Sequence, residues 1–175
     1  GISEEEPVTW TYKTLLQNIN KFANYLNSQN VAYNEAISVL LPNLPDTYAV
    51  LYGSEVQGIV NPINPLLEVQ HIASIIKAAG GKTLVTIAPI PVSDIWQKSL
   101  EITKLCPNIE TILTIDMAKY YPFLPKAEKH LGETYVEDRA INIIDYDEVM
   151  AVQNGDILES TRVIDPNDIA SYFNT

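Results

Sequence analysis

The sequence predicts an α/β fold in which a mostly parallel β-sheet is flanked by helices. Short apolar segments that end at proline or glycine alternate with longer segments whose apolar residues recur every three or four positions. The connections between them are short, and such an alternation is typical of a parallel sheet with helices on both faces. The chain has 175 residues, of which 46% are hydrophobic, which is sufficient to bury the core of one domain.

The first predicted elements are a helix and a strand. Thr9 or Thr11 supplies the N-cap of a helix whose apolar residues follow helical spacing as far as Leu26. The polar positions that we expect to face solvent are Lys13, Gln17, Asn18 and Lys21. The segment 36–41 is short, mostly apolar and stopped by Pro42, so it predicts a strand that is covered on both faces.

The central part of the chain repeats this alternation. Asn43 or Pro45 opens a second helix that ends near Gly58, and the segment 58–60 is a second short strand. Two Asn-Pro steps within 61–65 then force an extended or turning backbone. The elements predicted next, from apolar spacing, caps and glycine stops, are a helix from Pro65 or Glu68 to Gly80, a strand over 83–87, a helix from a Ser93 cap to Cys106, and a strand over 109–115.

The last third of the chain departs from this rhythm. Residues 117–139 are rich in aromatic residues and proline and include a short amphipathic piece near 126–131, so we expect an excursion from the sheet. A strand over 140–144 and a short helix over 146–151 then return to the sheet. The segment 169–173 resembles a strand that begins as the chain ends, and we therefore expect the protein to continue.

Charge and composition exclude several classes of protein. Against 11 Lys and Arg there are 22 Asp and Glu, so the formal charge of −11 disfavours nucleic-acid binding and docking on anionic lipid. No apolar run approaches the roughly 18 to 20 residues that a membrane-spanning helix needs. The lone Cys106 forms no intrachain disulfide, and the acidic Glu4–Glu6 run is unlike a secretory signal. We therefore expect a cytoplasmic protein.

The sequence contains no complete catalytic motif. Asp145, Asp147 and Glu148 are a carboxylate cluster that could bind a divalent ion, but carboxylates at a helix start more simply complement the helix dipole. Other residues with reactive or aromatic side chains also have a structural interpretation that we favour, because no neighbouring group is placed to activate them. They are His71, His130, Cys106 and the loop 120–123, which could line an acyl pocket but is better explained by packing onto the sheet.

Several stretches together carry a resemblance to a known family. They are 9–15, 22–26, 36–46, the Gly-x-x-x-x-Pro-x-Asn-Pro segment over 58–66, the helix and strand that follow it over 72–87, and 164–175. In this order and spacing they resemble the start of AMP-forming acyl-CoA synthetases. These enzymes belong to the adenylate-forming superfamily, which includes luciferases and peptide-synthetase adenylation domains.

The resemblance implies a domain organisation and one binding residue. Residues 1–175 would be a partial N-terminal AMP-binding domain, the first subdomain of the large N-terminal domain of adenylate-forming enzymes. It would comprise an α/β core over 1–116, an insertion over 117–139, and a return to the sheet over 140–175. Thr175 would be the first hydroxyl residue of the family's phosphate loop and the only cofactor-binding residue of this chain.

The chain departs from the family at two turns. Asn30 and Asn34-Glu35 stand where family members usually have Gly and Gly-Asp. Because asparagine tolerates positive φ better than most residues, we expect the turn at Asn30 to survive.

The resemblance also implies an activity for the whole enzyme. A carboxylic acid, in our interpretation a fatty acid, is activated by ATP as an acyl-adenylate and transferred to coenzyme A, with Mg²⁺ assisting. These groups would be bound mainly by residues beyond this chain, so no catalytic residue and no metal ligand is assigned here, and the chain alone is expected to be inactive.

Two alternatives stay open at this point. One is an adenylating enzyme of the peptide-synthetase or luciferase type, and the other is a non-enzymatic α/β interaction module. The expected partners are the acid, ATP and coenzyme A, with no nucleic acid, and a homodimer is one option. We also expect apolar surface that leads the isolated chain to self-associate.

Overall fold

The structure is a computed structural model that describes residues 8–121, 123–127, 131–136 and 138–174. Its helices are α1 (Tyr12–Ser28), α2 (Pro45–Gln57), α3 (Val69–Ala79), α4 (Ile95–Leu105) and α5 (Tyr146–Val152), with a 3₁₀ turn η1 at Met117–Lys119. Its strands are β1 (Ala36–Leu40), β2 (Ile59–Pro62), β3 (Thr83–Ile87), β4 (Thr111–Ile115), β5 (Gly132–Val136) and β6 (Arg139–Asp145). Within these ranges, no helix combines the length and the apolar character that a membrane crossing requires.

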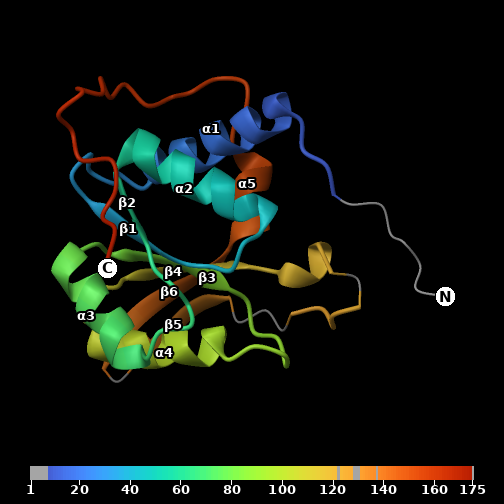
Figure 1. The fold of residues 1–175 in the computed structure, drawn as a ribbon, viewed down its shortest axis with the longest axis vertical. Coiled ribbons are helices and arrows are strands. Elements are labelled where there is room, and N and C mark those ends of the chain that lie inside the picture. The colour runs from blue at the N-terminus through green and yellow to red at the C-terminus, as the bar shows by residue number, and fades with distance from the viewer. Residues whose placement is uncertain (1–7, 122, 128–130, 137, 175) are drawn as a thin grey trace.

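The strands form one sheet with helices on both faces. The strand order is β2-β1-β3-β4-β6-β5, and every neighbouring pair is parallel except β5 and β6. Helices α1, α2 and α5 cover one face, and α3 and α4 cover the other (Figure 1). This arrangement confirms the predicted α/β fold with a mostly parallel sheet.

The core consists of two apolar layers, one on each face of the sheet. Alternate residues of a strand point to opposite faces. Ile37 and Val39 of β1 therefore pack in the layer that contains Phe22 of α1, whereas Leu40 packs in the layer that contains Ile72 of α3. All five residues are at most 2% exposed. Burial on both faces explains why β1 is apolar at almost every position.

Strand β5 corrects the expectation that residues 117–139 leave the sheet. It pairs antiparallel with β6 at the sheet edge, in the register that places Val136 opposite Arg139. Only Val136 of this strand is buried, and Tyr135 is 67% exposed. An edge strand with one partner and a mostly exposed surface carries no continuous apolar run, so its sequence lacks the signal that identified β1 and β3.

One predicted cap and one predicted turn are present, and a second predicted cap is not. The hydroxyl of Thr11 accepts a hydrogen bond from the amide of Thr14 (3.1 Å), which makes it the N-cap of α1. Asn30 adopts φ of 56°, the left-handed conformation expected of this turn. The expectation that Ser93 caps α4 is wrong, because the N-cap of this helix is Asp94. The hydroxyl of Ser93 lies one residue earlier and accepts a hydrogen bond from the amide of Ile95 (3.3 Å).

Residues 153–174 form an irregular segment, here called the C-terminal strap, that passes over α1 and returns to the sheet edge beside β2 (Figure 1). Gln17 Nε2 donates a hydrogen bond to Asp156 Oδ1 (2.7 Å), and Asn20 Nδ2 donates to the carbonyl oxygen of Gly155 (2.9 Å). The expectation that Gln17 faces only solvent is therefore wrong. The polar side of α1 is a binding surface for the strap.

Asn24 makes the most extensive contact with the strap. It is fully buried, and its Nδ2 donates to the carbonyl oxygens of Asn154 and Ile157, both at 2.8 Å. Its Oδ1 accepts a hydrogen bond from the amide of Glu159 at 2.8 Å. A buried amide is tolerated only when its polar atoms are paired, and here the strap supplies all the pairs.

Candidate functional site

The carboxyl ends of the parallel strands lie along one edge of the sheet, here called the carboxyl edge. Strand β1 is followed by α2 on one face, and its neighbour β3 is followed by α4 on the other face (Figure 1). The two connections, 41–44 and 88–94, therefore separate at the carboxyl edge. In open α/β sheets ligands bind at such a reversal of strand order, so this edge is the candidate site.

The end of the strap lies beside β2 and approaches this edge. The amide of Val60 donates to the carbonyl oxygen of Ala170 (2.9 Å), and the amide of Tyr172 donates to the carbonyl oxygen of Val60 (2.9 Å). These bonds form a parallel bridge between Val60 and Ser171, so the strand expected here is limited to one bridge. The strap runs in the direction of β2, toward the carboxyl edge. Thr175 lies outside the described residues, and its role stays a prediction.

An ion-pair network joins three loops at the carboxyl edge. Lys119, in the turn η1 after β4, places its Nζ 2.5 Å from Asp46 Oδ2 and 2.6 Å from Asp147 Oδ1. Asp46 lies in the first turn of α2 and Asp147 in the first turn of α5. The same Nζ lies 5.2 Å and 5.3 Å from the ring centres of Tyr120 and Tyr146. The network ties the connections that follow β1, β4 and β6.

Burial dominates the electrostatics of this network. Asp46 is 4% exposed, and its burial raises the pKa of the carboxyl, while the charge of Lys119 and its hydrogen bond lower that pKa in part. Burial and the Asp46 carboxylate raise the pKa of Tyr146 well above its ordinary value. Because two carboxylates already neutralise Lys119, this lysine does not offer an unpaired charge to an anionic ligand.

The predicted carboxylate cluster serves the start of α5. Asp145 Oδ1 accepts a hydrogen bond from the amide of Glu148 (3.0 Å), so Asp145 is the N-cap of this helix. Asp147 points instead to Lys119. Among the described residues, no group of three or more His, Cys, Asp or Glu side chains could hold a metal ion. Asp147 and Glu148 lie in the first turn of α5, as the helix-start interpretation predicts.

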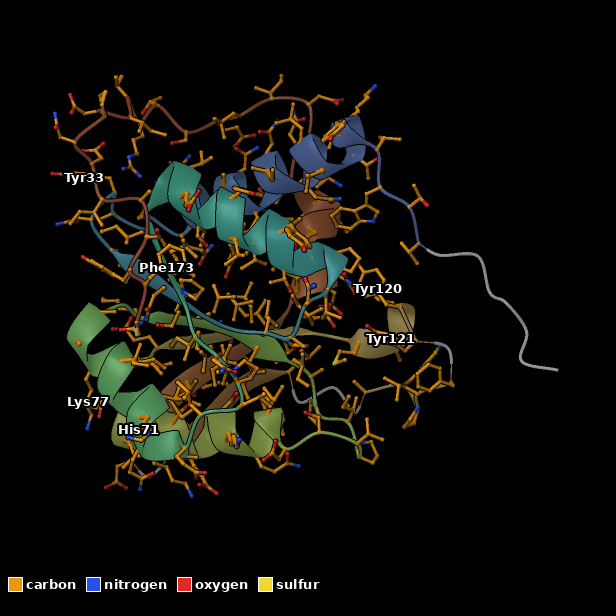
Figure 2. The ribbon with its side chains drawn as sticks, viewed as in Figure 1. Tyr33, His71, Lys77, Tyr120, Tyr121 and Phe173 are labelled. Carbon is orange, nitrogen blue, oxygen red and sulfur yellow. The ribbon has the colours of Figure 1, made fainter. Side chains whose placement is uncertain are left out.

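The other predicted candidates do not gather at the carboxyl edge. His71 is exposed on α3, far from Tyr120 and Tyr121 (Figure 2). Cys106 is buried, where its Sγ donates to the carbonyl oxygen of Ala73 (3.4 Å) and burial raises the pKa of the thiol. His130 and the Glu4–Glu6 run lie outside the described residues.

The aromatic loop after η1 packs mainly against the core. Tyr120 and Tyr121 are partly buried against the apolar layer beneath α1, α2 and α5. Phe123 is 81% exposed, with its ring centre 5.8 Å from that of Tyr121. Pro122 lies outside the described residues. Packing, rather than an acyl pocket, is the role that these contacts support.

An apolar cavity of about 420 Å³ lies between the starts of α1 and α2. No local sequence pattern predicts a cavity at this place. Its wall is largely aromatic and aliphatic, and its lining residues are Val8, Trp10, Thr11, Tyr12, Leu15, Asn43, Leu44, Pro45 and Tyr48. The lining residues among those that the structure describes include no charged side chain, so this cavity suits an apolar group.

Sequence reasoning missed residues that act between distant segments. Arg162 of the strap is one, with 9% of its side chain exposed. Its guanidinium donates to the carbonyl oxygens of Glu55 (3.3 Å) and Gly58 (3.1 Å) and pairs with Asp168 at 3.3 Å. Lys119 is another, because no local pattern relates it to its two carboxylate partners.

Comparison of the sequence with known proteins gives a consistent result. Residues 2–173 match the family described as AMP-binding enzyme. A marinolic acid–CoA ligase of Pseudoalteromonas sp. (strain SANK 73390) is 29% identical over 115 residues, 66% of this chain and 18% of that protein. A long-chain-fatty-acid–CoA ligase of Bacillus subtilis (strain 168) is 24% identical over 166 residues, 91% of this chain and 28% of that protein. The chain therefore spans less than a third of either relative.

Solved structures show the same fold. A mutant form of coronafacic acid ligase from Pectobacterium brasiliense has a TM-score of 0.68 at 20% identity, covering 93% of this chain and 27% of that one. The anthranilate CoA ligase AuaEII in complex with anthranoyl-AMP has a TM-score of 0.67 at 15% identity, covering 92% of this chain and 25% of that one.

Proposed function

We propose, since this chain belongs to the AMP-binding enzyme family, that it is the N-terminal part of an ATP-dependent acid–CoA ligase. The carboxylate of the acid would attack the α-phosphorus of ATP and release pyrophosphate. The thiol of coenzyme A would then displace AMP from the acyl-adenylate. The observation that carries the proposal is the path of the strap beside β2 toward the carboxyl edge, where the resemblance assigns the phosphate loop to begin at Thr175.

In this proposal the described residues position the phosphate loop, and they do not neutralise the charge of the ATP phosphates. Phosphoryl chemistry needs cationic groups and a metal ion at the phosphates. Lys119 at the carboxyl edge is neutralised by Asp46 and Asp147, and the described residues contain no group of three or more His, Cys, Asp or Glu side chains that could hold a metal ion. These residues therefore do not by themselves fit ATP with Mg²⁺. In our proposal ATP, Mg²⁺ and coenzyme A are held mainly by residues beyond this chain, which alone does not catalyse the reaction.

The names of the relatives support coenzyme A as the acceptor. Three of those reported above, the ligases of marinolic acid, long-chain fatty acids and anthranilate, include coenzyme A in their names. We propose a fatty acid as the substrate because the fatty-acid ligase matches 91% of this chain. Transfer of the acyl group to coenzyme A is the observation that would favour this proposal over a luciferase or peptide-synthetase type of enzyme.

We further propose that the enzyme acts in the cytoplasm as a monomer or homodimer. The acidic composition and the single, buried Cys106 are compatible with a reducing compartment. Cell fractionation of the full-length protein and its sedimentation velocity are the direct measurements.

The test of the function is acid-dependent ATP–pyrophosphate exchange. The full-length protein encoded by the gene and residues 1–175 alone would each be assayed with palmitate, cinnamate and anthranilate, with and without coenzyme A. We expect exchange and acyl-CoA only from the full-length protein, with the highest kcat/KM for palmitate. A full-length protein that shows no pyrophosphate exchange with any of the three acids would refute the ligase proposal. Exchange by residues 1–175 would refute the proposed inactivity of this part.

A further inference from the structure

Asn61 is a fully buried amide in β2, a strand whose first two residues are isoleucine and valine. Its Nδ2 donates a hydrogen bond to Ser38 Oγ on β1 (3.1 Å), and Ser38 is 1% exposed. Its Oδ1 accepts a hydrogen bond from Asn174 Nδ2 at the end of the strap (3.2 Å). Burial of an amide costs free energy unless both ends are paired, and the pairing of Asn61 requires the strap to be in place.

The backbone contact between the strap and β2 is too short to define its own alignment. It consists of one parallel bridge, between Val60 and Ser171, with two hydrogen bonds. A displacement by two residues would present the same backbone groups and keep the alternation of side chains. Such a displacement moves the chain by about 6.6 Å. The contact from Asn174 to Asn61 prevents such a displacement. The buried Oδ1 of Asn61 accepts a hydrogen bond from Asn174, and in a displaced strap Asn174 would no longer lie beside it.

We propose that Asn61 is a positioning residue that fixes the alignment of the strap against β2 and thereby the place of the phosphate loop. This inference rests on the proposed function, in which Thr175 begins that loop. Asn61 acts through Asn174 and contacts no substrate. A misplacement of about 1 Å can lower a rate on the order of 100-fold, so alignment at this contact affects the adenylation step.

The first experiment compares two buried hydrogen bonds in the full-length enzyme. Asn61→Leu keeps the approximate size of the side chain and removes both amide contacts. Thr86→Val is the matched control, since it removes the hydrogen bond between Thr86 and Ser99 (2.9 Å), which are fully buried and make no hydrogen bond to the described part of the strap. We expect kcat/KM for ATP in pyrophosphate exchange to fall at least about 10-fold in Asn61→Leu and to change less than about twofold in Thr86→Val. Equal loss in the two variants would overturn the proposal, because loss of any buried hydrogen bond would then explain it.

The second experiment uses the exposed partner, whose substitution does not threaten folding. Asn174→Leu is expected to match Asn61→Leu, and the double variant is expected to be no worse than either alone. Asn174→Asp is expected to retain kcat/KM within about threefold, because rotation of the Asn61 amide lets its Nδ2 donate to the new carboxylate and its Oδ1 accept from the Ser38 hydroxyl. Wild-type kinetics for Asn174→Leu, or additive effects in the double variant, would refute the positioning role.

A third measurement separates this inference from the proposed function. Hydrogen exchange of the Tyr172 amide, which donates to Val60, is expected to be at least about 10-fold faster in Asn61→Leu than in Thr86→Val. If the full-length protein activates no acid but this difference is present, the ligase proposal fails and the alignment role stands. If the enzyme is active and the Tyr172 amide exchanges equally in both variants, the alignment role fails.

Discussion

Replacement of Asn24 by alanine is expected to release the first part of the strap and lower the stability of the chain. Three hydrogen bonds join this side chain to Asn154, Ile157 and Glu159. At a net value of about 1 kcal/mol each, their loss lowers the free energy of unfolding by about 3 kcal/mol. The higher helix propensity of alanine returns about 0.5 kcal/mol. The net loss of about 2.5 kcal/mol corresponds to a decrease in Tm of roughly 5 to 10 °C for a chain of this size.

Urea unfolding followed by circular dichroism measures this loss, and hydrogen exchange of the Glu159 amide locates it. Asn18→Ala is the matched control, since Asn18 lies on the same helix and makes no hydrogen bond to the described part of the strap. It includes the same propensity gain, so its free energy of unfolding should stay within about 0.5 kcal/mol of wild type. A loss below about 1 kcal/mol for Asn24→Ala, or unchanged protection of the Glu159 amide, would refute the stabilising role of Asn24.

Three further outcomes follow from burial and close approach. Burial raises the pKa of Asp46 above 3.8, so as the pH falls through the raised value the folded chain binds a proton before the unfolded chain does. From pH 7 to pH 4 the wild type should therefore gain stability relative to Asp46→Asn in urea titrations, and a constant difference would contradict this. A Cβ on Gly81 would lie 1.7 Å from the carbonyl oxygen of Ala36, whereas Gly80, at φ of 77°, has open space. Gly80→Ala should cost about 1 kcal/mol, the penalty of the left-handed conformation, and Gly81→Ala clearly more; equal thermal shifts would show that the backbone relaxes freely. Finally, exposed side chains such as Phe173 (78%) predict concentration-dependent association of residues 1–175, which a constant monomer mass in light scattering would disprove.

Local sequence signals predicted the buried strands and their helices well. Strand β3 was expected over 83–87 and has these bounds, because its residues are buried on both faces and glycine precedes it. The N-cap Thr11 and the positive φ of Asn30 are also local properties and were predicted. Strand β5 was missed because an exposed edge strand is defined by its pairing with β6 rather than by its own composition.

The candidate site was harder to predict because its contacts are not local. Lys119 binds carboxylates from α2 and α5, which only the strand order brings together. The spacing of the polar residues Gln17 and Asn24 in α1 is equally compatible with a side that faces solvent. No nearby residue in the sequence indicates that the strap packs against them. Charge and periodicity describe one helix or strand at a time. A distant segment that packs over that element, such as the strap over α1, is seen only in the complete fold.

The strap lacks a continuous ladder of backbone hydrogen bonds. The stability of the chain and the alignment of the strap therefore depend on different residues. In a strand each hydrogen bond supports the next, whereas here side chains from α1 and from β2 hold separate points of an irregular chain. Loss of Asn24 should therefore free the residues near 154–159 while the bridge at Val60 and the contact from Asn174 to Asn61 keep the end of the strap in place. Loss of Asn61 should leave α1 covered and release the alignment at β2. Variants of the two residues should consequently have opposite profiles, with the larger stability loss for Asn24 and the larger kinetic loss for Asn61.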